Sequence, residues 1–148
     1  MPALTLYYAP GTCAQAVRIA LEEAQAPHAL VRVDFASQQQ RTPEYLAVNP
    51  KGRVPALVTE QGTLTETPAL LVYVAQRFPA AQLAPTDAFG LARMQEFNSY
   101  LASTVHIAHA HRPRAARTLG INQTNGAGKT QAFSKTAHVQ NTLDMGRI

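Results

Sequence analysis

The sequence contains a single cysteine and no long apolar run. One cysteine cannot form an internal disulfide, which excludes a small secreted scaffold held together by disulfides. No segment approaches the roughly 20 apolar residues that cross a bilayer, and the first residues lack the basic and apolar regions of a secretory signal. We therefore expect a soluble, cytoplasmic protein with no membrane partner.

The composition favours a folded domain. Apolar residues make up 46% of the 148 residues, which excludes wholesale disorder and fibrous repeats. The net charge of +4 is uneven: residues 1–111 carry seven basic and eight acidic side chains, whereas residues 112–148 carry six basic and one acidic. The excess positive charge therefore lies at the end of the chain, and we expect no nucleic-acid partner for the folded part.

Four short segments early in the chain have the pattern of β-strands. Leu4, Leu6 and Tyr8 are apolar residues at alternate positions, which is the repeat of a half-buried strand. Turn-forming residues separate the other three segments. The expected strands are 4–8, 31–34, 56–59 and 63–65, and the polar segment 37–42 is expected to be a loop.

Two helices are expected among these strands. Apolar residues recur on one face of 14–25, and Pro27 ends this helix. The second helix opens with Thr67 as its N-cap and Pro68 as its first residue, and it ends before Pro79. The order β-α-β followed by β-β-α predicts a small α/β domain built on one mixed sheet.

The pattern changes after residue 80. Residues 81–87 are expected to form a linker, and 88–111 the first helix of an incomplete all-α domain. The helix is predicted from apolar residues at steps of three or four: Leu91, Met94, Phe97, Leu101, Val105 and Ala108. Residues 112–148 lack such a pattern and are predicted to be an irregular, disordered or aberrant tail. We hypothesise a truncated or frameshifted product, which resequencing of the coding DNA would test.

Cys13 lies between the first expected strand and the first expected helix. Free backbone N–H groups at a helix N-terminus stabilise a thiolate, so the position suits a nucleophilic cysteine. A small buried apolar residue is an equally good interpretation. No Cys-x-x-Cys motif is present, which excludes dithiol redox cycling with an internal resolving cysteine.

Three other groups of residues have both a functional and an ordinary interpretation. Glu66 and Thr67 could receive the ammonium and carboxylate of an amino acid, but an ordinary helix cap is the simpler explanation. A cis Val54-Pro55 bond would expose the backbone of Val54 to a peptide ligand, but cis bonds are rare, so the residues alone predict trans. His106 and His109 share a helix face without a nearby acidic residue or cysteine, so no metal site is expected.

Several segments together resemble the bacterial beta class of the glutathione transferases. They are Tyr8-Ala9-Pro10-Gly11-Thr12-Cys13, Val48-Asn49-Pro50-Lys51-Gly52-Arg53-Val54-Pro55-Ala56-Leu57 and Leu64-Thr65-Glu66-Thr67. The similarity continues through 96–106 and covers about the first 110 residues. The resemblance implies a thioredoxin-like domain at 1–80 that binds glutathione, followed by an all-helical domain. It also implies a homodimer that acts in detoxification.

The resemblance implies roles for individual residues. The backbone of Val54, before a cis Pro55, would pair with the cysteinyl part of glutathione, and Glu66 and Thr67 would hold its γ-glutamyl end. Cys13 would lie against the glutathione sulfur, where it can form a mixed disulfide.

Four further site residues are implied by the same resemblance. His106 would approach the glutathione sulfur from the helical domain. Gln38, Ser99 and Ser103 complete the expected glutathione-binding set. Gln38 and Ser99 replace a lysine and an asparagine common in the family, which suggests weaker binding of glutathione.

These implications predict a metal-free transferase that joins the glutathione thiolate to a hydrophobic electrophile. We expect little conjugation activity, because most of the helical domain that builds the electrophile pocket is missing from the sequence. Two alternatives stay open. One is glutaredoxin-like thiol-disulfide exchange through Cys13, and the other is a non-catalytic fragment that only binds glutathione.

Overall fold

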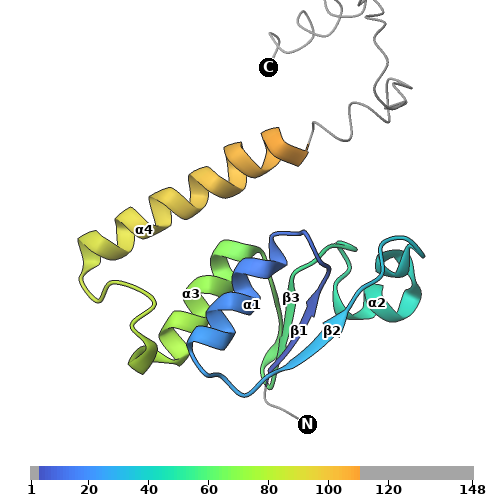
Figure 1. The fold of residues 1–148 in the computed structure, drawn as a ribbon, viewed down its shortest axis with the longest axis horizontal. Helices are drawn as coiled ribbons and strands as arrows, with labels where there is room; N and C mark the ends of the chain where they lie inside the picture. Colours follow the sequence, from blue (N-terminus) through green and yellow to red (C-terminus); the bar gives the residue numbers. More distant parts are fainter. Residues whose placement is uncertain (1–3, 111–148) are drawn as a thin grey trace, which may run out of the picture. The chain divides into compact units, whose positions relative to one another are not determined.

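The computed structural model of this protein describes residues 4–110, so the predictions for the segment 112–148 lie outside the described residues. Four strands form one mixed sheet in the order β2-β1-β3-β4. Strand β1 pairs in parallel with β2 and antiparallel with β3, and β3 pairs antiparallel with β4 (Figure 1). The strands are β1 (Leu4–Tyr8), β2 (Ala29–Arg32), β3 (Ala56–Thr59) and β4 (Gly62–Thr65). The predicted mixed sheet and its order of elements are confirmed.

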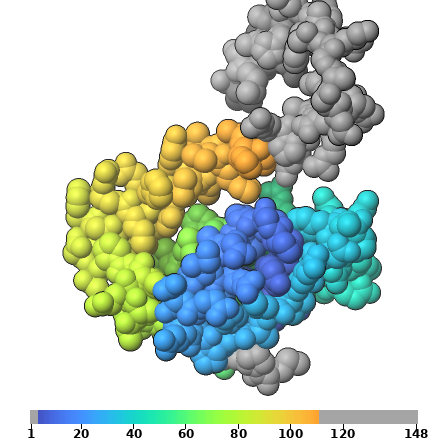
Figure 2. Space-filling model, viewed as in Figure 1, coloured from blue at the N-terminus to red at the C-terminus, as the bar shows by residue number. Residues whose placement is uncertain are grey.

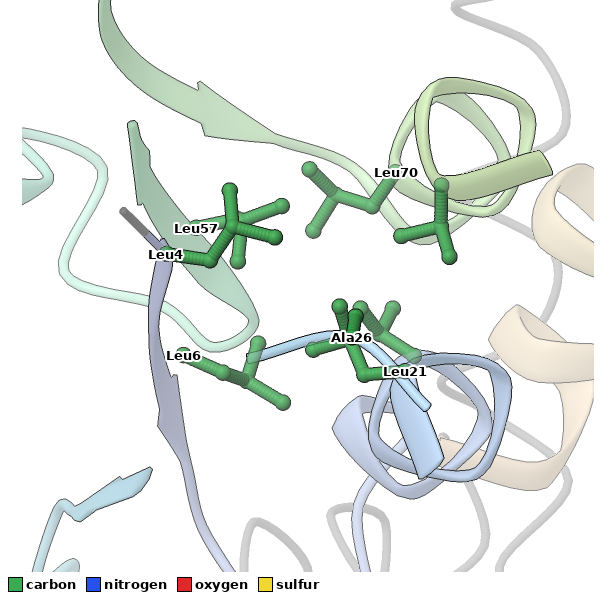
Figure 3. Close-up of a cluster of buried hydrophobic side chains, with 8 residues drawn as sticks. Leu4, Leu6, Leu21, Ala26, Leu57 and Leu70 are labelled. Atoms are coloured by element: carbon green, nitrogen blue, oxygen red, sulfur yellow. The ribbon is translucent and has the colours of Figure 1, made fainter. Parts of the chain in front are cut away.

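The main core lies between the sheet and two helices, α1 (Ala14–Glu23) and α3 (Thr67–Arg77), which pack against each other (Figure 1). Alternate residues of β1 face these helices because successive side chains of a strand point to opposite faces. The buried cluster consists of Leu4, Leu6, Val17, Leu21, Ala26, Leu57, Leu70 and Val74 (Figure 3). Each buried leucine contributes about 1.5–3 kcal/mol through removal of apolar surface from water.

The other residues of β1 point to the opposite face of the sheet, where α2 (Pro43–Val48) packs. The ring of Tyr45 in α2 lies edge-on to the ring of Tyr7 in β1, with 5.7 Å between the ring centroids. Tyr45 is buried, so this contact fixes α2 and the loop that follows it against the sheet.

Helix α2 was not expected from the sequence, although its start carries ordinary helix signals. The Thr42 side chain accepts a hydrogen bond from the backbone N–H of Tyr45 at 3.4 Å, and Pro43 occupies the first helical position. Six residues are too few to show a helical apolar repeat. The predicted loop at 37–42 is also only partly correct, because Gln39–Arg41 form a 3-10 turn.

Strand β2 begins two residues earlier than expected because its parallel register aligns Thr5 with Ala29. Val33, which the sequence pattern placed inside the strand, follows it. Its backbone N–H still donates to the carbonyl of Tyr8 at 2.8 Å, and its side chain is buried. The apolar pattern therefore identified a buried segment but not the residues at which strand β2 begins and ends.

Helix α4 (Ala88–Tyr100) follows a 3-10 turn at Pro79–Ala81 and contacts α3. The Asp87 carboxylate caps α4 by accepting a hydrogen bond from the backbone N–H of Gly90 at 2.8 Å. No residue of α4 is buried within the described part of the chain. The division into domains at residue 80, with a linker at 81–87, stays a prediction.

The helix predicted after residue 87 is confirmed, but it is not a regular α-helix throughout. Residues Leu101–Val105 form a π-helical turn, and the α-helix resumes over 106–110. A π turn holds more residues than an α turn, so the α-helical spacing of apolar residues does not continue through it. None of the helices within 4–110 has the length and apolar character needed to span a bilayer.

The packing of α1 leads to a stability prediction. Leu21 of α1 is fully buried, whereas Ile19 of the same helix is 51% exposed. Part of α1, in blue, lies on the surface seen in Figure 2. Leu21→Ala should lower the free energy of unfolding by about 2–5 kcal/mol because it leaves a cavity. Ile19→Ala should change it by no more than about 0.5–1 kcal/mol. Urea denaturation of both variants checks this, and equal losses would contradict the assigned core.

Candidate functional site

Three connecting segments meet at one end of the sheet, where β1 and β4 end and β3 begins; we call this end the sheet edge. Tyr7 of β1 is paired with Ala56 of β3, and Ala56 is paired with Thr65 of β4. Because β3 runs antiparallel to both neighbours, β1 and β4 end at the edge where β3 begins. The turn that carries Cys13, the loop that carries Val54 and the start of α3 are therefore brought to the same edge.

The turn after β1 places Cys13 directly before α1. Gly11 has a φ of +70°, a conformation that glycine adopts without steric cost, and the Thr12 hydroxyl donates to the carbonyl of Ala9 at 2.7 Å. The half-buried Cys13 side chain has its Sγ 3.9 Å from the carbonyl oxygen of Val54. A thiol and a backbone carbonyl 41 residues apart in sequence are thus neighbours.

Asn49 holds the loop that precedes β3. Its side chain is only 2% exposed; its Nδ2 donates to the carbonyl of Arg53 at 2.6 Å, and its Oδ1 accepts from the backbone N–H of Lys51 at 3.1 Å. The hydroxyl of Tyr45 also donates to the Arg53 carbonyl, at 2.7 Å. Burial raises the pKa of the Tyr45 phenol, so its deprotonation lies still further above neutral pH. The loop therefore presents Val54 from a rigid base.

The Val54-Pro55 peptide bond is cis. The prediction of a trans bond, made from the residues alone, is wrong, whereas the resemblance implied a cis bond at this position. Pro55 is buried and Val54 is half-buried. The local sequence holds no signal that separates this proline from the many that are trans.

Glu66, not Thr67, is the N-cap of α3, which corrects the predicted helix start. Glu66 has φ 72° and ψ 116°, a backbone conformation that is rare for a residue with a side chain, and its side chain makes no capping hydrogen bond. Thr67 and Pro68 are the first two helical residues. Unusual backbone angles of this kind are concentrated at functional sites, so they favour a functional interpretation of Glu66 over an ordinary cap.

Lys51 is a residue of this edge that sequence reasoning missed as a candidate. Its Nζ donates to Oε1 of Glu66 at 2.6 Å and to the Thr65 hydroxyl at 3.0 Å. The two charged side chains lie 15 positions apart in sequence, and only the pairing of β3 with β4 brings them together. No local pattern could have revealed this ion pair.

The remaining predicted site residues are all exposed. Gln38 lies in the loop after β2, with a φ of 57°, and Ser99 lies on α4. Ser103 is in the π-helical turn, and His106 follows it directly. Within residues 4–110, no hydrogen bond or ion pair joins these four side chains to Cys13, Val54 or Glu66. Among the predicted residues, the strand pairing and the Cys13–Val54 contact place Cys13, Val54, Pro55, Glu66 and Thr67 at the same sheet edge.

A metal site has no support among the described residues. His106 and His109 are followed on the chain by His111, which lies outside the described residues. Across 4–110, no group of three His, Cys, Asp or Glu side chains is arranged to hold a metal ion.

The two donors to the Arg53 carbonyl lead to a graded prediction. Tyr45→Phe should lower the free energy of unfolding by about 1 kcal/mol, because the carbonyl keeps the bond from Asn49. Asn49→Ala should cost more, about 1–3 kcal/mol, because it removes a donor and an acceptor from a buried site.

Thermal or urea unfolding measures both effects. Asn98→Ala on α4 is the control and should change the free energy of unfolding by less than about 0.5 kcal/mol. A smaller effect for Asn49→Ala than for Tyr45→Phe would show that Asn49 does not hold the loop.

Comparison with known proteins agrees with this geometry. Residues 2–76 match the family model described as glutathione S-transferase, N-terminal domain. Among curated proteins, the chain is 39% identical over 106 residues to glutathione S-transferase GstA of Escherichia coli O157:H7, which covers 70% of this chain and 53% of that protein. The chain thus spans about half the length of the curated relatives it matches.

Solved structures show the same fold. A glutathione transferase homologue from Sulfitobacter, with bound glutathione, matches with a TM-score of 0.74 and 52% identity, over 88% of this chain and 59% of that one. The beta-class glutathione S-transferase of Sphingomonas chungbukensis matches with a TM-score of 0.63 and 37% identity, over 84% of this chain and 59% of that one. The thioredoxin-like N-terminal domain is therefore confirmed, and the chain belongs to the glutathione S-transferase family.

Proposed function

We propose that the sheet edge formed around Cys13, Val54 and Glu66 binds glutathione for transfer of its thiolate to an electrophile. The observation that carries this proposal is the 3.9 Å approach of the Cys13 Sγ to the Val54 carbonyl, at the edge where Glu66 is the N-cap of α3. This arrangement offers a peptide ligand a strand-like backbone, a neighbouring sulfur and an anionic side chain.

Each part of the edge has a role matched to one part of the tripeptide. The backbone of Val54 pairs with the cysteinyl residue in the manner of an added strand. The sulfur of that residue then lies beside Cys13. The carboxylate of Glu66 receives the γ-glutamyl ammonium, while the hydroxyl and backbone N–H of Thr67 at the start of α3 receive the adjacent carboxylate.

The reaction follows from the position of the ligand sulfur. The thiol proton leaves for solvent, because the thiolate is the nucleophile. The sulfur then forms a bond to an electrophilic carbon of the second substrate, and the displaced electron pair leaves with the departing group or moves to the neighbouring atom. The Cys13 sulfur forms no covalent bond during this step. We assign His106 a catalytic role near the glutathione sulfur, and Gln38, Ser99 and Ser103 roles in binding glutathione, as the family resemblance implies.

The remaining properties of the whole protein are also proposals. The second substrate is a hydrophobic electrophile, and the functional unit is a homodimer that acts in detoxification. Support for these comes from family membership. They are proposals because the relatives are about twice as long as the part that this chain matches. The cytoplasmic location stays a prediction from the sequence.

The role of Glu66 can be tested by calorimetric titration with glutathione. Glu66→Gln removes the negative charge that receives the ammonium and should weaken binding at least about tenfold. Glu60→Gln is the matched control, since Glu60 is an exposed carboxylate in the β3–β4 turn at the other end of the sheet. Equal affinities for the two variants would contradict a γ-glutamyl site at Glu66.

The role of Cys13 separates transfer from thiol-disulfide exchange. Cys13→Ser should leave the glutathione affinity within about threefold, which is less than 1 kcal/mol, because the attacking sulfur belongs to the ligand. The variant should conjugate a chromogenic electrophile at about the same rate as the wild-type chain. If the wild-type chain instead reduces glutathione mixed disulfides and the variant does not, exchange through Cys13 is the activity.

A further inference from the structure

The Lys51–Glu66 ion pair contributes little to the stability of the fold. Its side chains are 53% and 66% exposed, and ion pairs at such exposure contribute about 0.2–1 kcal/mol. The pair nevertheless joins the loop before β3 to the start of α3, at the edge that also carries Cys13. An ion pair that contributes so little can exchange one of its partners for a ligand at small cost.

The backbone beneath Lys51 is held firmly. Its N–H donates to the buried Asn49 side chain, and the next N–H, of Gly52, donates to the Asn49 carbonyl at 2.9 Å. Gly52 has a φ of +60°, and a Cβ there would lie 2.9 Å from the carbonyl oxygen of Gln40. The fixed backbone keeps the Lys51 ammonium within reach of Glu66, while the exposed side chain leaves it free to change partner.

The free end of a γ-glutamyl residue carries an ammonium and a carboxylate on the same carbon. Glu66 attracts the ammonium but repels the carboxylate beside it. A cation already in contact with Glu66 removes this conflict, because the ligand can then form two ion pairs in place of the one that it breaks. A carboxylate also gains charge-assisted hydrogen bonds from an ammonium donor.

We propose that Lys51 is a specificity-determining residue that binds the α-carboxylate of the γ-glutamyl end together with the hydroxyl and backbone N–H of Thr67, while Glu66 binds its ammonium. This inference rests on the proposed function. The site then selects ligands that carry both charges at this end and discriminates against those that carry the ammonium alone. Lys51 gives up the Glu66 carboxylate when the ligand binds and remains in contact with the Thr65 hydroxyl.

The test is a calorimetric titration of the full chain with two ligands. One is glutathione, and the other is 4-aminobutanoyl-Cys-Gly, which keeps the amine and lacks the α-carboxylate. Lys51→Met should weaken glutathione binding about tenfold and change binding of the analogue less than about twofold. Lys51→Arg, which keeps the charge, should retain most of the affinity for glutathione.

Arg77→Met is the control, because it removes the same charge from the opposite end of α3. Three results would overturn the role of Lys51: equal glutathione affinities for Lys51→Met and Arg77→Met, equal losses for both ligands, or tighter binding after Lys51→Met. Tighter binding would mean that Lys51 competes with the ligand ammonium for Glu66 and does not bind the α-carboxylate. A wild-type chain that does not bind glutathione would instead overturn the proposed function and this inference together.

Discussion

The register that pairs Tyr7 with Ala56, and Ala56 with Thr65, is the constraint on which the rest of the structure depends. A slip of one residue in β3 would turn Leu57 out of the core, because side chains alternate between the faces of a sheet. The same slip would move Val54 away from Cys13. Burial of the core therefore also sets the geometry of the candidate site.

Rigid and adjustable parts are separated at the sheet edge. The backbone near Val54 is held by buried groups, since Asn49 and Tyr45 both donate to the carbonyl of Arg53. The charges of Lys51 and Glu66 are instead exposed and make their contact through long side chains. A peptide ligand thus meets a preformed backbone, which limits the entropy lost on binding, and a pair of charges that can rearrange around it.

The elements predicted correctly from the sequence are those with a clear apolar repeat or a strong turn signal. Strands β1 and β3, helix α1 and the end of α3 fall in this group. Helix α2 is too short for a repeat, and the π-helical turn at Leu101–Val105 follows a segment whose residues fit an ordinary helix equally well. Helix α2 is held by the tertiary contact between Tyr45 and Tyr7, which local propensity does not report.

The features of the candidate site likewise divide into those that the sequence predicts and those that it does not. Cys13, Glu66 and Thr67 were identified as candidates from their positions near helix starts, and the resemblance added the cis bond before Pro55. The Lys51–Glu66 contact could not be predicted, because it depends on the β3–β4 pairing. Glu66 as N-cap could not be predicted either, because nothing in its neighbours indicates a φ of 72°.

The central claim is that one edge of the sheet binds the tripeptide. Its most direct test is the change of backbone amide resonances of the ¹⁵N-labelled chain during addition of glutathione. The account predicts shifts at Cys13, Val54 and Thr67 with a common dissociation constant, and none in the β3–β4 turn around Glu60, at the opposite edge. Shifts centred on that turn, with Val54 and Thr67 unchanged, would contradict it.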